Sequence, residues 1–187
     1  VRKITFAAEK PMSFLPGQFV MFVAQSTLPS GKSGVMKRAY SLCSPRSQAQ
    51  RISIALNVST HGAISPIVYN LKKGDKVGLE GPYGLFTLHD TSRKKVFLAG
   101  GTGISPILSM LYELEQQKKM QDVLVIYSAK KEEDVLFRKE LADFEREGAR
   151  IVITLTEEAP PSWKGETRRS EGAMSTQFVH DPSAWAV

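Results

Sequence analysis

Apolar runs alternate with segments of helical periodicity in the second half of this 187-residue chain. Runs at 96–99, 123–127 and 151–155 have the length and composition of buried strands. Between them, apolar residues recur at helical spacing, namely Ile107, Leu108, Leu111 and Leu114 in the first segment and Phe137, Leu141 and Phe144 in the second. This β-α-β-α-β order predicts a parallel sheet, with any ligand outside the carboxyl ends of its strands. Residues 93–187 are therefore expected to form an α/β domain, in which Asp134 caps the second helix.

Residues 1–92 have a different pattern, in which short alternating or β-branched segments are separated by glycine and proline turns. Strands are predicted at 20–24, 38–42, 52–58 and 76–80. Gly81-Pro82 is expected to end the last of them as a turn. A short helix is expected near 64–71, because apolar residues recur there at helical spacing and Pro66 stands in the first turn. Such regular spacing of short strands predicts an antiparallel β-barrel.

Charge divides the chain at about the same place. Residues 1–100 hold 14 Lys and Arg against 4 Asp and Glu, whereas residues 101–187 hold 11 against 15. The basic first part favours phosphate-bearing ligands and acidic protein partners. The basic residues are scattered, without a helix-turn-helix or RNP-like segment, so we expect no nucleic-acid partner.

Cysteine and histidine usage limits the chemistry. A single cysteine, Cys43, excludes an internal disulfide and a four-cysteine iron–sulfur cluster within this stretch. The three histidines are scattered, so no metal site is expected. We find no apolar run long enough for a membrane span and no secretory signal at the start, and we expect a cytoplasmic protein.

Gly100-Gly101-Thr102-Gly103 follows a predicted strand and precedes a predicted helix. Glycines in this place let the backbone approach a diphosphate, and the helix N-terminus favours negative charge. Pro106 stands where the dinucleotide fingerprint has its third glycine, which indicates a different subclass of nucleotide site. By itself, the segment could equally be a tight turn without a ligand.

Two further motifs lie in the first part of the chain. In Arg38-Ala39-Tyr40-Ser41, strand alternation places Arg38 and Tyr40 on one face, where they could bind a phosphate and stack on a planar cofactor. A solvent-facing strand is the simpler interpretation of this segment alone. Gly62-Ala63-Ile64-Ser65 opens the short helix and could bind a phosphate, although an ordinary Ser65 N-cap is the simpler local interpretation.

Taken in order, these motifs resemble those of the ferredoxin–NADP reductase family. Pro16-Gly17-Gln18 is similar to the family's early Pro-Gly-Gln segment, and residues 38–41 match its Arg-x-Tyr-Ser/Thr flavin signature. Residues 62–65, 81–84 and 100–106 are similar to its pyrophosphate turn, the turn that closes the flavin domain, and its nicotinamide-nucleotide loop. The resemblance implies an antiparallel FAD-binding β-barrel at 1–92 and a parallel α/β NAD(P)-binding domain at 93–187.

The resemblance also implies residue roles. Arg38 would pair with the FAD diphosphate, Tyr40 would stack on the isoalloxazine ring, and Ser41 would hydrogen-bond flavin N5, which makes Tyr40 and Ser41 the expected catalytic residues. The further cofactor-binding residues are Asn57, Gly62, Ile64 and Ser65 for FAD, and Gly101, Thr102, Gly103, Ser128 and Lys130 for NAD(P)H. The implied reaction moves a hydride from NAD(P)H to FAD. Electrons then pass to an acidic carrier protein, such as a ferredoxin or flavodoxin, or to a fused iron–sulfur domain.

Two departures from the family pattern leave alternatives open. Arg168-Arg169 stands where the family usually has Gly-Arg, and the later strand with its Cys-Gly-Pro turn is absent, although Trp185-Ala186-Val187 is similar to the beginning of that strand. We therefore expect a chain cut at both ends, with an incomplete nucleotide domain. One alternative is a flavin-binding electron-transfer subunit without independent NAD(P)H turnover, and another is a nucleotide-binding regulatory domain without flavin.

The choice between NADH and NADPH also stays open. Lys130, Lys131 and Arg168 suit a 2′-phosphate, whereas Glu157 and Glu158 suit a free ribose, because carboxylates bind hydroxyls and repel phosphate.

Overall fold

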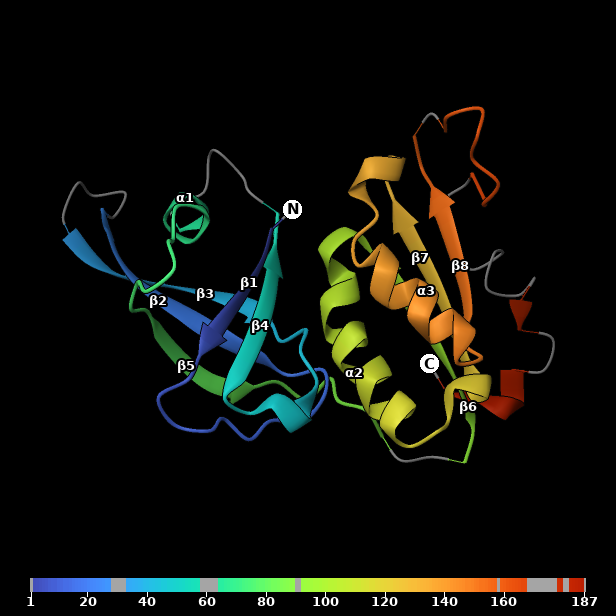
Figure 1. Ribbon diagram of the computed structural model, residues 1–187, viewed down its shortest axis with the longest axis horizontal. Helices are drawn as coiled ribbons and strands as arrows, with labels where there is room; N and C mark the ends of the chain where they lie inside the picture. Colours follow the sequence, from blue (N-terminus) through green and yellow to red (C-terminus); the bar gives the residue numbers. More distant parts are fainter. Residues whose placement is uncertain are drawn as a thin grey trace. The chain divides into compact units, whose positions relative to one another are not determined.

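The computed structural model describes residues 2–27, 33–57, 64–89, 92–157, 159–167, 178–179 and 182–186. The chain divides into two compact units, residues 1–88 and 89–187 (Figure 1). Each unit is described by itself. Within the described ranges, no helix combines the length and the apolarity that a membrane crossing requires.

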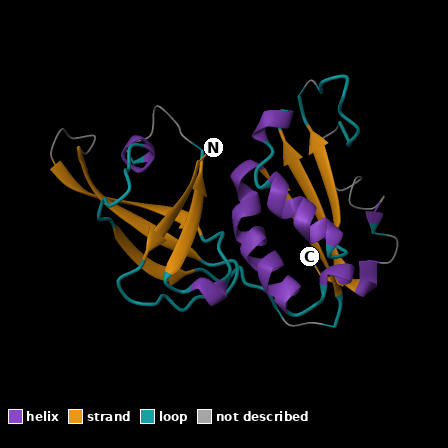
Figure 2. Ribbon diagram, viewed as in Figure 1, coloured by secondary structure: helices purple, strands orange, loops and turns teal. Residues whose placement is uncertain are grey.

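In its described part, the first unit has two antiparallel sheets. β1 (Arg2–Ala7) pairs with β4 (Arg51–Leu56), and β2 (Phe19–Thr27) lies between β3 (Ser33–Ser41) and β5 (Gly78–Tyr83). A bridge between Leu42 and Ile54 connects the end of β3 to β4. The sheets enclose one apolar core, which includes Val20, Phe22, Ile52, Ile54 and Leu56. The predicted antiparallel architecture is confirmed (Figure 2).

Short helices complete the first unit. A 3-10 helix spans Arg46–Gln48, and α1 spans Ser65–Tyr69 with Val68 buried, as the spacing of apolar residues predicted. The expected turn at Gly81-Pro82 is wrong, because β5 continues to Tyr83. The pairing of β2 with β5 shifts register between Phe19 and Met21. Such an irregularity accommodates a proline, which has no N–H to donate to the ladder.

The second unit contains a parallel sheet with the order β8-β7-β6-β9. Its strands are β6 (Lys94–Gly100), β7 (Val123–Ala129), β8 (Arg150–Leu155) and β9 (Trp185–Ala186). α2 (Ile104–Gln116) connects β6 to β7, and α3 (Arg138–Arg146) connects β7 to β8. The two helices pack on each other through Tyr112 and Phe144, whose rings lie 5.2 Å apart. The predicted parallel α/β architecture is confirmed (Figure 1).

A second apolar cluster lies along the sheet of the second unit. Val96, Leu124 and Ile126 are buried there, and Phe178, Val179 and Trp185 from the C-terminal part of the chain pack against them. Basic side chains stack on two of these aromatic rings, Lys94 on Trp185 and Arg150 on Phe178. The short strand β9 therefore belongs to the sheet, and Phe178 and Val179 pack against its apolar cluster.

The segment between β7 and α3 differs from the prediction. A 3-10 turn occupies Glu132–Asp134, and α3 begins only at Arg138, with Phe137 at its N-cap position in the left-handed conformation. The expected Asp134 cap is therefore wrong. The Leu136 N–H, which the side chain of an Asp134 N-cap would accept, donates instead to the hydroxyl of Tyr127 at 3.2 Å. Further 3-10 turns occupy Gly101–Gly103, Met120–Asp122 and Pro182–Ala184.

Candidate cofactor sites

Arg38 and Tyr40 lie on one face of β3, as strand alternation predicts. In the pairing with β2, Arg38 stands opposite Phe22 and Tyr40 opposite Val20. Directly opposed residues of antiparallel strands share a face of the sheet. The Tyr40 ring meets the buried Phe22 ring edge-on, with centroids 6.4 Å apart, while Arg38 is exposed. The core thus holds the aromatic ring in place and leaves the guanidinium accessible.

Tyr40 connects β3 to the start of α1. Its hydroxyl is hydrogen-bonded to the side chain of Ser65, and the Arg38 charge acts on it. Burial raises the pKa of Tyr40 above its ordinary value, and the Ser65 hydrogen bond and the Arg38 charge oppose that rise. The structure therefore brings together Arg38, Tyr40 and Ser65 from two motifs that are distant in sequence.

The simple N-cap interpretation of Ser65 is wrong. Ile64 occupies the N-cap position of α1, without a side-chain cap hydrogen bond, and Ser65 bonds Tyr40 instead. The Ile64 side chain is 1% exposed and belongs to the barrel core, so only its backbone could face a ligand. Asn57 is exposed directly after β4. Gly62 lies outside the described residues.

Ser41 is on the other face of β3. It stands opposite Phe19, whose ring packs at 5.9 Å from that of Tyr83. Tyr40 and Ser41 could therefore reach one planar group only at the end of the strand, and β3 does end at Ser41. The structure does not place the Ser41 side chain with the Tyr40–Ser65 pair.

Gln18 connects two motifs that the sequence presents as separate. Its side-chain oxygen accepts from the Leu15 N–H at 2.8 Å, and its amide nitrogen donates to the Gly84 carbonyl at 3.3 Å. Two exposed apolar side chains follow Gly84, Leu85 at 94% and Phe86 at 60% exposure. The Pro-Gly-Gln segment thus anchors the end of the 81–84 segment.

The glycine loop of the second unit follows β6 directly. Gly101–Gly103 form a 3-10 turn, Gly101 has a φ of 51°, and α2 starts at Ile104. A Cβ atom built on Gly100, Gly101 or Gly103 would meet no atom within 4 Å. This uncovered backbone lies at the carboxyl end of β6, between β7 and β9. Strand order reverses at this point of the sheet, where α/β folds bind ligands.

Ser128 and Lys130 lie near the same edge of the sheet. Ser128 is the β7 partner of Gly100 in the parallel ladder. Lys130 is exposed, and its Nζ lies 3.7 Å from Oε1 of Glu157, which follows β8. A basic and an acidic side chain therefore meet at this edge of the sheet, and the pair does not decide between NADH and NADPH. Arg168 and Glu158 lie outside the described residues.

The residues fit the two implied cofactors. The Ser105 hydroxyl in the first turn of α2 is buried and has no hydrogen-bond partner among the described residues. Buried hydroxyls normally have a partner. This hydroxyl and the uncovered glycine backbone fit a nucleotide diphosphate, and the Arg38–Tyr40–Ser65 cluster fits the phosphate and flat ring of FAD. Across the described ranges, no three His, Cys, Asp or Glu side chains gather as metal ligands would.

Comparison with known proteins divides the chain into the same two units. The family model of the oxidoreductase FAD-binding domain matches residues 1–88, and that of the oxidoreductase NAD-binding domain matches residues 97–186. The chain is 34% identical over 169 residues to ferredoxin–NADP reductase B of Sorangium cellulosum (strain So ce56), covering 88% of this chain and 67% of that protein. The chain belongs to the ferredoxin–NADP reductase-like family. It carries the family's FAD-binding and NAD-binding domains, which form an oxidoreductase.

Other members of this reductase family extend the comparison. Methane monooxygenase component C of Methylosinus trichosporium is 31% identical over 158 residues, covering 81% of this chain and 44% of that protein. The chain thus spans less than half the length of this relative. A Neisseria gonorrhoeae ferredoxin NADP+ reductase structure with bound FAD and NADP has a TM-score of 0.78 at 24% identity, covering 98% of this chain and 76% of that one. The structural likeness supports the two-domain fold.

Proposed function

We propose that this reductase-like chain accepts a hydride from NAD(P)H on FAD and passes the electrons to a protein carrier. The observation that carries the proposal is the presence, in one chain, of the Arg38–Tyr40–Ser65 cluster and the uncovered glycine loop before α2. When bound, the flavin supplies the chemistry that converts a hydride into single electrons. The protein supplies binding, orientation and electrostatics.

In the first unit, the proposed roles follow from side-chain chemistry. Arg38 is exposed and permanently charged, and it neutralises the FAD diphosphate. Tyr40 packs on the flavin ring, and its hydroxyl is held by the hydrogen bond to Ser65. Ser41, at the end of β3, hydrogen-bonds the N5 edge of the ring. Asn57, Gly62 and Ile64 complete the FAD site in this proposal.

In the second unit, the proposed roles depend mainly on backbone. Gly101, Thr102 and Gly103 hold the nicotinamide nucleotide, because they form the turn at the start of α2 and a Cβ atom on Gly101 or Gly103 would meet no atom within 4 Å, which leaves room for a diphosphate at the helix N-terminus. Ser128, beside Gly100 in the ladder, and Lys130 face its adenosine end.

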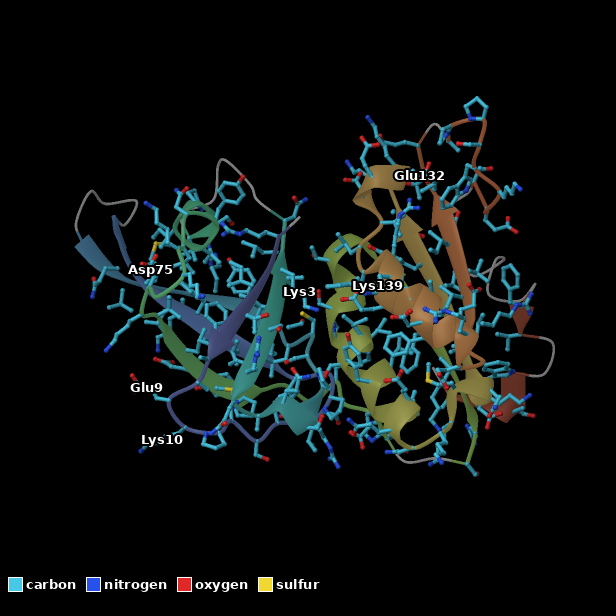
Figure 3. The ribbon with its side chains drawn as sticks, in the orientation of Figure 1. Lys3, Glu9, Lys10, Asp75, Glu132 and Lys139 are labelled. Carbon is cyan, nitrogen blue, oxygen red and sulfur yellow. The ribbon has the colours of Figure 1, made fainter. Side chains whose placement is uncertain are left out.

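An acidic carrier protein, or a fused iron–sulfur domain, is the proposed electron acceptor. Exposed basic side chains predominate in the described part of the first unit, namely Arg2, Lys3, Lys10, Lys37, Arg38, Arg46, Arg51, Lys72, Lys73 and Lys76. Two of the acids there have local partners, because Glu80 pairs with Lys37 at 2.7 Å and Asp75 accepts from the Lys72 N–H at 2.7 Å. Figure 3 shows Lys10 and Glu9 on the loop after β1. If the rate of carrier reduction does not fall as salt is added, this electrostatic proposal fails.

An anaerobic absorption experiment tests the proposal. The protein is reconstituted with FAD, and NADH and then NADPH are added while the flavin band is followed. Bleaching supports both cofactor sites and identifies the donor. A bound flavin that stays oxidised favours an electron-transfer subunit without NAD(P)H turnover, and a protein that binds no FAD overturns the proposal.

A further inference from the structure

The hydroxyl of Tyr127 lies between two loops of the second unit. The residue is buried on β7, the strand between β6 and β8. Its hydroxyl donates to the Gly101 carbonyl at 3.1 Å and accepts from the Leu136 N–H at 3.2 Å. Gly101 has a φ of 51°, and Phe137, the residue after Leu136, has a φ of 56°, so both are in the left-handed region. One hydroxyl therefore fixes two unusual turns that follow neighbouring parallel strands.

The same hydroxyl limits what Ser105 can bond. A serine in a helix commonly donates to the carbonyl four residues earlier, which for Ser105 is that of Gly101. A carbonyl oxygen has two lone pairs. The Gly101 carbonyl accepts from the Ile104 N–H and from the Tyr127 hydroxyl. The buried Ser105 hydroxyl remains without a partner among the described residues.

We propose that Tyr127 is a positioning residue for the nicotinamide nucleotide, which it serves by fixing the glycine loop and by keeping the Ser105 hydroxyl available to the ligand. The inference rests on the proposed nucleotide-binding role of residues 100–103. Tyr127 is buried beneath the loop and acts through Gly101 and Ser105. Its hydroxyl affects binding of the nucleotide more than the rate of flavin reduction once the nucleotide is bound.

The protonation state of Tyr127 suits this role. Burial raises the pKa of its hydroxyl above the ordinary value, and the charge of Asp134 acts in the same direction, while the Leu136 hydrogen bond opposes them. The hydroxyl therefore stays protonated at assay pH and continues to donate to Gly101.

A double-mutant cycle on the FAD-loaded protein tests the inference. Dissociation constants for NAD+ and NADP+ are measured by calorimetry in the parent, Tyr127→Phe, Ser105→Ala and the double variant. For whichever nucleotide binds more tightly to the parent, we expect Tyr127→Phe to weaken binding about five- to tenfold and Ser105→Ala about threefold. Losses of this size are typical when a single hydrogen bond is removed. In the Tyr127→Phe background, Ser105→Ala should have no further effect, because Ser105 then bonds the freed Gly101 carbonyl.

Two measurements separate positioning from general destabilisation. Hydrogen exchange of the Leu136 amide should be slowed by saturating nucleotide in the parent and accelerated about tenfold or more in Tyr127→Phe. Flavin reduction at saturating nucleotide should change less than twofold. Tyr112→Phe, at a half-buried tyrosine farther along α2, is the control and should leave the dissociation constants and Leu136 exchange unchanged.

These experiments distinguish failure of the Tyr127 inference from failure of the proposed reductase function. If the parent binds and oxidises NAD(P)H, but Tyr127→Phe binds as tightly as the parent or the two substitutions are simply additive, the Tyr127 inference is overturned while the reductase proposal stands. Absence of Leu136 protection by nucleotide in the parent also overturns it, without any variant. A parent that binds no nucleotide overturns both.

Discussion

The two units present their candidate cofactor residues in opposite ways. In residues 1–88, side chains from distant segments converge, with Tyr40 bonded to Ser65 and Arg38 beside it. In residues 89–187, the candidate site consists mostly of glycine backbone at Gly100, Gly101 and Gly103. The Tyr127 hydroxyl holds this backbone through its hydrogen bond to the Gly101 carbonyl. The first arrangement is sensitive to removal of side chains. The second is sensitive to added side chains, and this difference can be tested.

The largest effect is expected from Arg38→Ala. Losing a charge-assisted bond to a diphosphate costs about 2–3 kcal/mol, which weakens FAD binding roughly 30- to 150-fold. The ratio of flavin to protein absorbance and a fluorescence titration with FAD measure the loss. Lys37→Ala is the matched control, because Lys37 is the preceding residue of β3 and pairs with Glu80. Equal losses in the two variants would refute a specific role for Arg38.

Gly103→Ala tests the opposite sensitivity in the second unit. Gly103 has a φ of −62°, and its added Cβ would meet no atom within 4 Å, so alanine fits the protein itself. We expect the thermal midpoint to stay constant or rise, because alanine restricts the unfolded chain. We expect the KM for NAD(P)H to rise about tenfold, since a methyl group keeps the diphosphate from the backbone. FAD content should not change, and unaltered KM would show that the loop does not approach the nucleotide.

Ser65→Ala should have a smaller effect on the first unit. It removes the hydrogen bond to Tyr40 and should weaken FAD binding about fivefold, which corresponds to about 1 kcal/mol. Tyr40→Phe removes the same bond, so the double variant should lose little more than either single variant. FAD titrations of the three variants test this, with Ser13→Ala, at an exposed serine, as the control. Independent, additive losses would mean that the two hydroxyls act separately.

The sequence was sufficient for those parts of the structure that depend on periodicity. Alternation along β3 predicted the shared face of Arg38 and Tyr40, and the change from strand to helical spacing predicted the parallel sheet. Motif order predicted the family. These features depend on neighbours in sequence, and therefore a single chain reveals them.

The contacts that support the candidate sites were not predictable in the same way. A tyrosine in an apolar run indicates a core residue, and the partners of Tyr127 are backbone atoms, a carbonyl and an N–H that almost every residue has. The Asp134 cap was wrong because Leu136 bonds this distant tyrosine, and the Ser65 cap was wrong because Ser65 bonds Tyr40. In each case a tertiary hydrogen bond replaced the local one.

The smallest expected effect concerns acidic groups of the second unit. Burial, followed by the charges of Glu147 and Asp143, raises the pKa of Glu115 on α2 above its ordinary value. The folded state therefore holds this proton more tightly than the unfolded state, so the free energy of unfolding falls as pH rises above the ordinary glutamate pKa.

Glu115→Gln removes the cost of ionising this carboxyl in the folded state and keeps a good helix former. We expect a gain at pH 7 of at most a few tenths of a kcal/mol, because solvent screens the partly exposed group, and no gain below about pH 4. Thermal unfolding of the two proteins across this pH range measures it. A gain that persists at low pH would have to come from helix propensity or packing, whereas a gain that appears only as the carboxylates ionise, with FAD content unchanged, would confine the effect to electrostatics within the second unit.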